Sequence, residues 1–252
     1  MKTKTNFTDA LIESIVVEAL PAYKFDNLPL SANQEKFFKN SVVRDSNNNL
    51  LPVYHGTETG GFSEFNSGIK FDNKEAFIWF SADLNHAKEY MGWEDDFDDD
   101  FEDEFEDDFE DEFEYKPQIY EVFLNITNPV MLTRLDTEAF SQDKKPTKEL
   151  LAIISALSTS VQERFNIYKK LTAITETVLK RDYVISGISD IQVFDIVKNP
   201  EFRELLLHYK PNCDGIICSD NSGATTTYGV LYPNQIKAID NLNPTNSNNI
   251  YK

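Results

Sequence analysis

The sequence has few of the residues from which common metal and cofactor sites are built. Its two cysteines, Cys213 and Cys218, are too few for a disulfide framework or a four-thiolate metal site, and we expect both to be reduced, buried thiols. The three histidines, His55, His86 and His208, are widely spaced, and no H-E-x-x-H motif occurs. The nine glycines form neither G-x-G-x-x-G nor G-x-x-x-x-G-K. The sequence therefore gives no support to zinc hydrolases, kinases or dehydrogenases, and it predicts no metal site.

Long apolar runs are also missing. The nearest one, from Ala10 to Leu20, is interrupted by Glu13 and Glu18 and is too short to cross a bilayer. The first ten residues contain no apolar core of a secretory signal. We therefore expect a cytoplasmic protein with no membrane partner, unless a signal-independent system delivers it into a host cell.

Basic residues are outnumbered, with 24 against 43 acidic ones and a formal charge of −19. The segment Glu94–Glu114 alone holds 16 acids and no base, which leaves 27 acids against 24 bases elsewhere. Generic binding to a nucleic-acid backbone needs the opposite sign and is disfavoured.

The acidic tract, residues 94–114, repeats a phenylalanine every four residues, at Phe97, Phe101, Phe105, Phe109 and Phe113. As a helix it would carry a slowly drifting aromatic stripe, because four exceeds 3.6 residues per turn. Three acids in each repeat repel one another, so we favour a solvated coil. The alternative is an interaction element for a basic partner.

The rest of the chain predicts an α+β fold. Hydrophobic residues make up 40% and aromatic residues 13%, which is enough for a core. Alternation and turn residues predict strands within 41–57, at 76–82, from Gln118 to the Asn128-Pro129 pair, and within 213–220 and 226–239. Helical spacing predicts helices from Thr8 to Pro21, at 84–91, at 147–181 and at about 188–209. Strands at both ends with helices between them favour α+β over an alternating parallel sheet.

Six short sequence motifs follow one another along the chain, and their order is informative. They read SVVRDSNNNLLPVYHGT (41–57), FSEFN (62–66), WFSADLNHAKEYMG (79–92), IYEVFLNITNPVML (119–132), CDGIIC (213–218) and YGVLYPNQIKAID (228–240). In this order they resemble the His-Tyr-Glu branch of the ADP-ribosyltransferases, which includes diphtheria-type toxins and the poly(ADP-ribose) polymerases. The closest resemblance is to the transferase domains in polyvalent proteins of phages and mobile elements.

This resemblance covers about 37–133 and 211–247 and implies an ADP-ribosyltransferase fold, two small packed antiparallel sheets that form an NAD cleft. The organisation it implies is a helical arm (1–36), a transferase-like domain (37–247) and a tail (248–252). The domain would contain two insertions, the acidic tract and a helical block at 135–210.

The resemblance also implies NAD⁺ as a substrate, with no metal. The residues implied to hold it are His55, Gly56, Thr57, Trp79, Ser81 and Tyr90. His55 would hydrogen-bond a ribose hydroxyl, and the Gly56 backbone would hold the nicotinamide carboxamide. Trp79 stands where the family has a tyrosine, and with Tyr90 it would enclose the nicotinamide between two aromatic faces. Ser81 matches a small residue at the pocket floor.

Each of these residues also has an ordinary interpretation. Alone, Trp79 and Tyr90 are core or helix-packing aromatics and His55 is a core or surface histidine. Next to the other blocks, we favour the nucleotide pocket for all three. His86 and His208 keep the ordinary interpretation.

One position departs from the family pattern. The catalytic glutamate of the family immediately precedes the tyrosine of the last block, and here that residue is Thr227. A threonine can hydrogen-bond the nicotinamide ribose but brings no charge to stabilise the oxocarbenium cation. Chain elongation is therefore disfavoured, whereas transfer of one unit stays open if the acceptor's own carboxylate supplies the charge.

The function predicted is that of a mono-ADP-ribosyltransferase with His55, Tyr90 and Thr227 as catalytic residues and a macromolecular acceptor, in the first place a protein. Two alternatives remain: a degenerate module that binds NAD⁺ or ADP-ribose without turnover, and an interaction protein that acts through its acidic tract.

Deleting residues 94–114 separates these alternatives for the acidic tract. Folding and NAD⁺ affinity should stay nearly intact, because so charged a segment contributes little core. The measurements are cooperative thermal unfolding and salt-sensitive capture of basic partners. Loss of cooperative unfolding would show that the phenylalanine repeat packs in the core.

Overall fold

The computed structural model describes residues 29–66, 76–92, 115–132, 134–141, 145–186, 191–220 and 225–252. The helix expected from Thr8 to Pro21 and the acidic tract lie outside these residues. The described strands are β1 (Val53–Thr57), β2 (Ile78–Ser81), β3 (Gln118–Leu124), β4 (Pro129–Leu132), β5 (Gly215–Asp220), β6 (Thr225–Val230) and β7 (Ile236–Ala238). An α+β class is therefore observed, as predicted.

The sheet differs from the expected pair of packed antiparallel sheets. The described strands form one seven-stranded sheet in the order β4-β5-β6-β2-β1-β3-β7. Neighbours run antiparallel except β4 and β5, which are parallel. The two groups β4-β5-β6-β2 and β1-β3-β7 are joined by one register pair, Tyr54 with Ser81. This narrow connection makes a single mixed sheet out of what the resemblance implied as two.

The strand expected from Gln118 is shorter than predicted. β3 ends at Leu124, and Pro129 begins a separate strand, β4, beside β5. Between them, the Asp214 carboxylate accepts hydrogen bonds from the backbone N–H groups of Thr127 and Asn128, at 2.7 and 2.8 Å. These bonds give the two N–H groups acceptors at the point where the chain leaves the sheet after β3.

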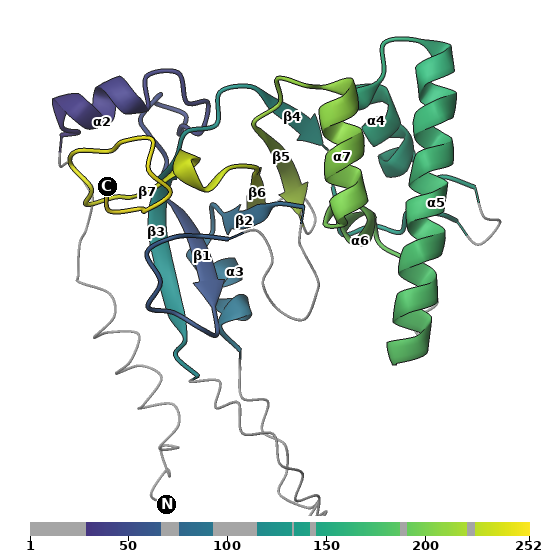
Figure 1. Cartoon of the computed structure of the whole chain (residues 1–252), viewed down its shortest axis with the longest axis horizontal. Coiled ribbons are helices and arrows are strands. Elements are labelled where there is room, and N and C mark those ends of the chain that lie inside the picture. Colours follow the sequence, from purple (N-terminus) through teal and green to yellow (C-terminus); the bar gives the residue numbers. More distant parts are fainter. Residues whose placement is uncertain are drawn as a thin grey trace, which may run out of the picture.

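The helices are α2 (Ala32–Phe37), α3 (Leu84–Lys88), α4 (Lys148–Leu157), α5 (Val161–Ser186), α6 (Val193–Val197) and α7 (Pro200–Tyr209), with short 3₁₀ turns η1 (Glu89–Met91) and η3 (Pro233–Gln235). Helices α4 to α7 gather beside β4 and β5, whereas α2 and the C-terminal loop lie at the other end (Figure 1). Among the described helices, none combines the length and apolar character that a bilayer crossing requires.

The sheet separates two hydrophobic cores. On one face, Ile216 and Cys218 of β5 join the buried residues of α4 to α7 in one cluster. On the other face, Ile217 of β5 packs with residues of β1, β2, β3 and β7. The period-2 alternation of strand side chains produces this division. Both cysteines are buried thiols, as predicted.

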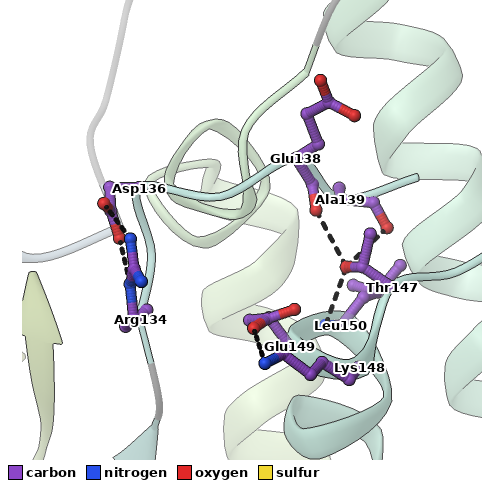
Figure 2. A network of polar contacts seen from close by, with 8 residues as sticks. All are labelled: Arg134, Asp136, Glu138, Ala139, Thr147, Lys148, Glu149 and Leu150. Carbon is purple, nitrogen blue, oxygen red and sulfur yellow. Dashed lines mark hydrogen bonds and ion pairs between the residues drawn. The ribbon is translucent and has the colours of Figure 1, made fainter. Parts of the chain in front are cut away.

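The helical block is fastened at the start of α4. Thr147 is the N-cap: its hydroxyl donates to the Glu138 carbonyl at 2.8 Å and accepts from the Leu150 N–H at 3.5 Å (Figure 2). An Arg134–Asp136 ion pair at 2.8 Å lies in the same segment that leads from β4 (Figure 2). The cap thus fixes both the first turn of the helix and the chain that enters it.

A buried lysine holds the C-terminal loop. Lys237 in β7 is fully buried, and its ammonium group donates to the carbonyls of Ser247 and Asn249. Asn249 in turn bonds the Ser63 hydroxyl at 3.0 Å. Burial lowers the pKa of Lys237 to about 8, because the charged form loses its hydration.

The titration of Lys237 predicts a pH dependence of stability. Between its native pKa of about 8 and its higher unfolded value, the unfolded state binds more protons, so stability should rise with pH. Relative to Lys237→Met, the wild type should gain about 3 kcal/mol across this range, given 1.36 kcal/mol per pKa unit.

The measurement is denaturant unfolding of both proteins from pH 7 to 11. Comparing the two proteins cancels the contribution of titrating groups that both contain. Tyr120 is one of them, and burial raises its pKa to about 12. Parallel stability curves for the two proteins would contradict the prediction.

Candidate active site

A cavity of about 670 Å³ opens where β1 and β2 meet α3, η1 and α6. All seven residues singled out in the sequence line it: His55, Gly56, Thr57, Trp79, Ser81, Tyr90 and Thr227. Its volume lies within the roughly 300–1,000 Å³ of small-molecule sites. The structure therefore brings together residues that are spread over more than half of the sequence.

His55 is held in a defined tautomer. Its Nδ1 lies 2.7 Å from the carbonyl oxygen of Trp79, which can only accept, so Nδ1 carries the proton and donates. The ring packs edge-on against Phe65 at 5.0 Å and lies 5.4 Å from Phe80. Burial lowers the pKa of His55 and keeps the ring neutral, despite the opposing hydrogen bond to Trp79. Nε2 is left as an acceptor.

Gly56 is required by the approach of α3. A Cβ built at this position would lie 1.8 Å from the carbonyl oxygen of Ala87. No side chain fits there, so glycine lets α3 lie directly on β1. The helix begins at Asp83, whose side chain accepts from the Asn85 N–H at 2.8 Å, and the following turn ends at Gly92 with φ of +68°. This confirms the helix and glycine stop predicted at 84–92.

Trp79 both lines the cavity and packs against neighbouring aromatic side chains. It lines the cavity, and its indole packs on Phe77 at 5.5 Å and on Phe194 of α6 at 5.1 Å. Its Nε1 is buried and has no hydrogen-bond partner within the described residues. The packing of Trp79 against α6 thus makes the helical block part of the cavity wall.

Tyr90 differs from Trp79 because it is not a core residue. Its side chain is 55% exposed at the cavity rim, and its ring meets His86 edge-on at 5.4 Å. An aromatic side chain this exposed at the rim of a cavity can contact a planar ligand. Exposure therefore contradicts a core role for Tyr90, whereas its contact with His86 fits the helix-packing alternative.

Thr227 lies in β6, directly opposite Ser81 of β2. Cross-strand partners have Cβ atoms about 4.5–5.5 Å apart and project from the same face. The buried Thr227 therefore stands beside the pocket floor, next to Ser81 and within reach of the Trp79 strand.

The comparisons with known proteins decide the family. The family model described as ADP-ribosyltransferase in polyvalent proteins matches residues 45–246. The chain belongs to this family. It matches none of the curated proteins and none of the solved structures with which it was compared.

For this ADP-ribosyltransferase domain, the match spans the cavity and both flanking groups of strands, including the position of Thr227. The family supports a transferase that uses NAD⁺ as substrate. No cluster of three or more His, Cys, Asp or Glu side chains suited to a metal occurs in the part of the chain that is described.

The helical block supplies lining residues that sequence reasoning missed. Phe194 and Lys198 of α6 and its C-terminal turn reach the cavity, and the Lys198 ammonium pairs with Asp195 at 2.8 Å. His86, assigned an ordinary role, also lines it. One local signal could have found His86, which stands four residues before Tyr90, whereas nothing local indicated that α6 would reach β2.

Gly56→Ala tests the approach of α3. The new methyl group would collide with backbone and push the helix away, at a cost of about 3 kcal/mol. We expect a lower melting temperature and loss of any NAD⁺-induced stabilisation, both measured by thermal unfolding.

Gly61→Ala is the matched control. Gly61 has φ of +85°, but a Cβ there meets no atom closer than 3.4 Å, so only backbone strain of about 1 kcal/mol is added. If Gly56→Ala is no more harmful than this control, the close packing of α3 on β1 is not needed.

Proposed function

We propose that this domain is a mono-ADP-ribosyltransferase, which cleaves NAD⁺ at the nicotinamide–ribose bond and transfers ADP-ribose to a macromolecular acceptor, in the first place a protein. The observation that carries the proposal is the convergence of all seven predicted residues on one cavity. Family membership supports the reaction class.

The neutral His55 suits the ribose of NAD⁺. Its Nε2, left as an acceptor by the bond from Nδ1 to Trp79, takes a hydrogen bond from a ribose hydroxyl. The backbone of Gly56 holds the carboxamide, and Thr57 continues this wall. These contacts fix the sugar and the base relative to each other before the bond breaks.

The aromatic residues hold the nicotinamide. Tyr90 offers its exposed side chain, and Trp79, anchored on Phe194, offers a rigid second surface. The nicotinamide ring is cationic in NAD⁺, so two π faces favour its binding. The leaving ring takes the electron pair of the glycosidic bond and becomes neutral nicotinamide.

The remaining charge must be stabilised near Thr227. Breaking the glycosidic bond leaves a cationic ribose, and the threonine hydroxyl contributes a hydrogen bond to it without a negative charge. Loss of one such group typically lowers the rate by about 10²–10³-fold. The reaction is therefore slow and limited to one ADP-ribose unit for each acceptor site.

A second function is favoured by the same residue. With Thr227 in place of the family's glutamate, the cavity suits a module that binds NAD⁺ or ADP-ribose without turnover. Release of free nicotinamide distinguishes the two: the transferase produces it and the binding module does not. A basic partner of the acidic tract is compatible with either function.

Thr227→Glu tests the reaction directly. A carboxylate beside the nicotinamide ribose should raise NAD⁺ hydrolysis by up to about 10²-fold, because it stabilises the developing cation. The measurements are nicotinamide release and transfer of labelled ADP-ribose to protein. Thr227→Val, which removes only the hydroxyl, should abolish activity if that hydroxyl binds the ribose.

Thr226→Glu is the control for added charge. Thr226 is the preceding residue of β6, so its side chain projects from the opposite face and adds the same charge away from the cavity. His55→Ala and Tyr90→Ala should both remove the NAD⁺-induced rise in melting temperature. If Thr227→Glu folds and binds NAD⁺ but is no faster than the wild type, Thr227 does not occupy the glutamate position.

A further inference from the structure

A chain of three polar side chains runs along the α3 side of the cavity. The Ser81 hydroxyl lies 3.2 Å from Nδ1 of His86, and Nε2 of His86 lies 4.0 Å from a carboxylate oxygen of Glu89. Ser81 is 4% exposed, whereas the side chains of His86 and Glu89 are 16% and 65% exposed. The series therefore runs from the buried floor of the cavity out to solvent.

The hydrogen-bond partners of Ser81 and His86 indicate which atom of each side chain donates and which accepts. The Ser81 oxygen accepts the Asp83 N–H at 3.0 Å, which fills one of its two acceptor positions. In the tautomer with the proton on Nε2, that proton faces the Glu89 carboxylate 4.0 Å away and Nδ1 is an acceptor. The Ser81 hydroxyl then donates to Nδ1 and keeps one acceptor position open.

These three residues have the arrangement of an activated hydroxyl. A hydroxyl bonded to an imidazole, which is oriented in turn by a carboxylate, is the general device for removing a proton from an oxygen nucleophile. The ordinary interpretation is a capping interaction at the start of α3. The cap of α3, however, is already made by Asp83, and both Ser81 and His86 face the cavity.

The location of the Ser81–His86–Glu89 series also supports a catalytic role. Ser81 is the cross-strand partner of Thr227, the residue at the position of the family's glutamate. A base that acts through Ser81 would therefore act next to Thr227, where a glutamate is expected from the family pattern.

We propose that Ser81, His86 and Glu89 form a proton relay that deprotonates a hydroxyl acceptor, and that the acceptor is a serine, threonine or tyrosine side chain of a protein. The proposal rests on the proposed transferase function and names the substrate class of the same site. Ser81 is the catalytic residue that touches the acceptor, and His86 and Glu89 are positioning residues that act through it.

The transfer balances as follows. The acceptor oxygen forms a bond to C1′ of the nicotinamide ribose, and the C1′–nitrogen bond breaks with its electron pair moving to nicotinamide. The acceptor proton passes to the Ser81 oxygen while the Ser81 proton passes to Nδ1 of His86. The imidazolium, held by the Glu89 carboxylate, then releases its proton to solvent.

His86→Gln tests the relay, with two nucleophiles compared in the same enzyme. Water needs to lose a proton when it attacks, whereas azide is already an anion and needs no base. The variant should release nicotinamide into water about 10²-fold more slowly, within the range that a positioned general base contributes. Formation of ADP-ribosyl azide should stay at the wild-type rate, and NAD⁺ affinity, measured by calorimetry, should not change.

Glu89→Gln keeps the test independent of folding, because Glu89 is largely exposed. It should slow hydrolysis by at most about five-fold, since an exposed ion pair is worth roughly 0–1 kcal/mol, and it too should spare the azide reaction. Asn85→Ala, an exposed position of the same helix, is the control and should behave as the wild type.

The outcomes separate the two levels of the proposal. If hydrolysis and azide transfer fall together in His86→Gln, or if neither changes, the relay is wrong while the transferase stands. If the wild type releases no nicotinamide with water or azide, the proposed function itself fails.

Discussion

The contact between α3 and β1 at Gly56 is the constraint on which the site depends. Because Gly56 has no side chain, the Ala87 carbonyl can lie where a Cβ would be, and the helix rests directly on the strand. This contact brings His86 and Tyr90 to the cavity, which Ser81 of β2 also lines. A strand with any other residue at this position would lift the helix and widen the cavity on the side that we propose holds the nicotinamide.

Charge is distributed unevenly around the cavity. Burial keeps His55 neutral, although its hydrogen bond to Trp79 opposes this effect, and Thr227 carries no charge. Two carboxylates, Glu58 and Glu64, line the cavity, and Glu89 lies at the outer end of the Ser81–His86 series. The proposed relay would supply a base at the acceptor while leaving the cationic ribose less stabilised than in relatives that have the glutamate.

The sequence predicted the local elements and the membership of the cavity well. Alternation indicated β2, and capping residues with Gly92 indicated α3. The ordered blocks indicated seven of the residues that line the cavity. These signals are local or fixed by a family pattern. The sheet was predicted less well: neither the parallel pairing of β4 with β5 nor the single pair joining β1 to β2 has a periodic signature. Phe194 and Lys198 were missed for the same reason, because only tertiary packing brings α6 to Trp79.

The single register pair between β1 and β2 also shapes how the chain folds. The pairings of β2 with β6, β3 with β7 and β4 with β5 all close loops that contain the helical block. Such loops cost little more as they lengthen, about 0.6 kcal/mol for each doubling, which is how the sheet accommodates long insertions. Local helical contacts form early and these distant pairings late. His55 belongs to one group of strands, and Trp79 and Thr227 belong to the other. The cavity is therefore complete only when β1 pairs with β2. A ligand that contacts both groups of strands therefore stabilises the connection between β1 and β2 by its binding free energy.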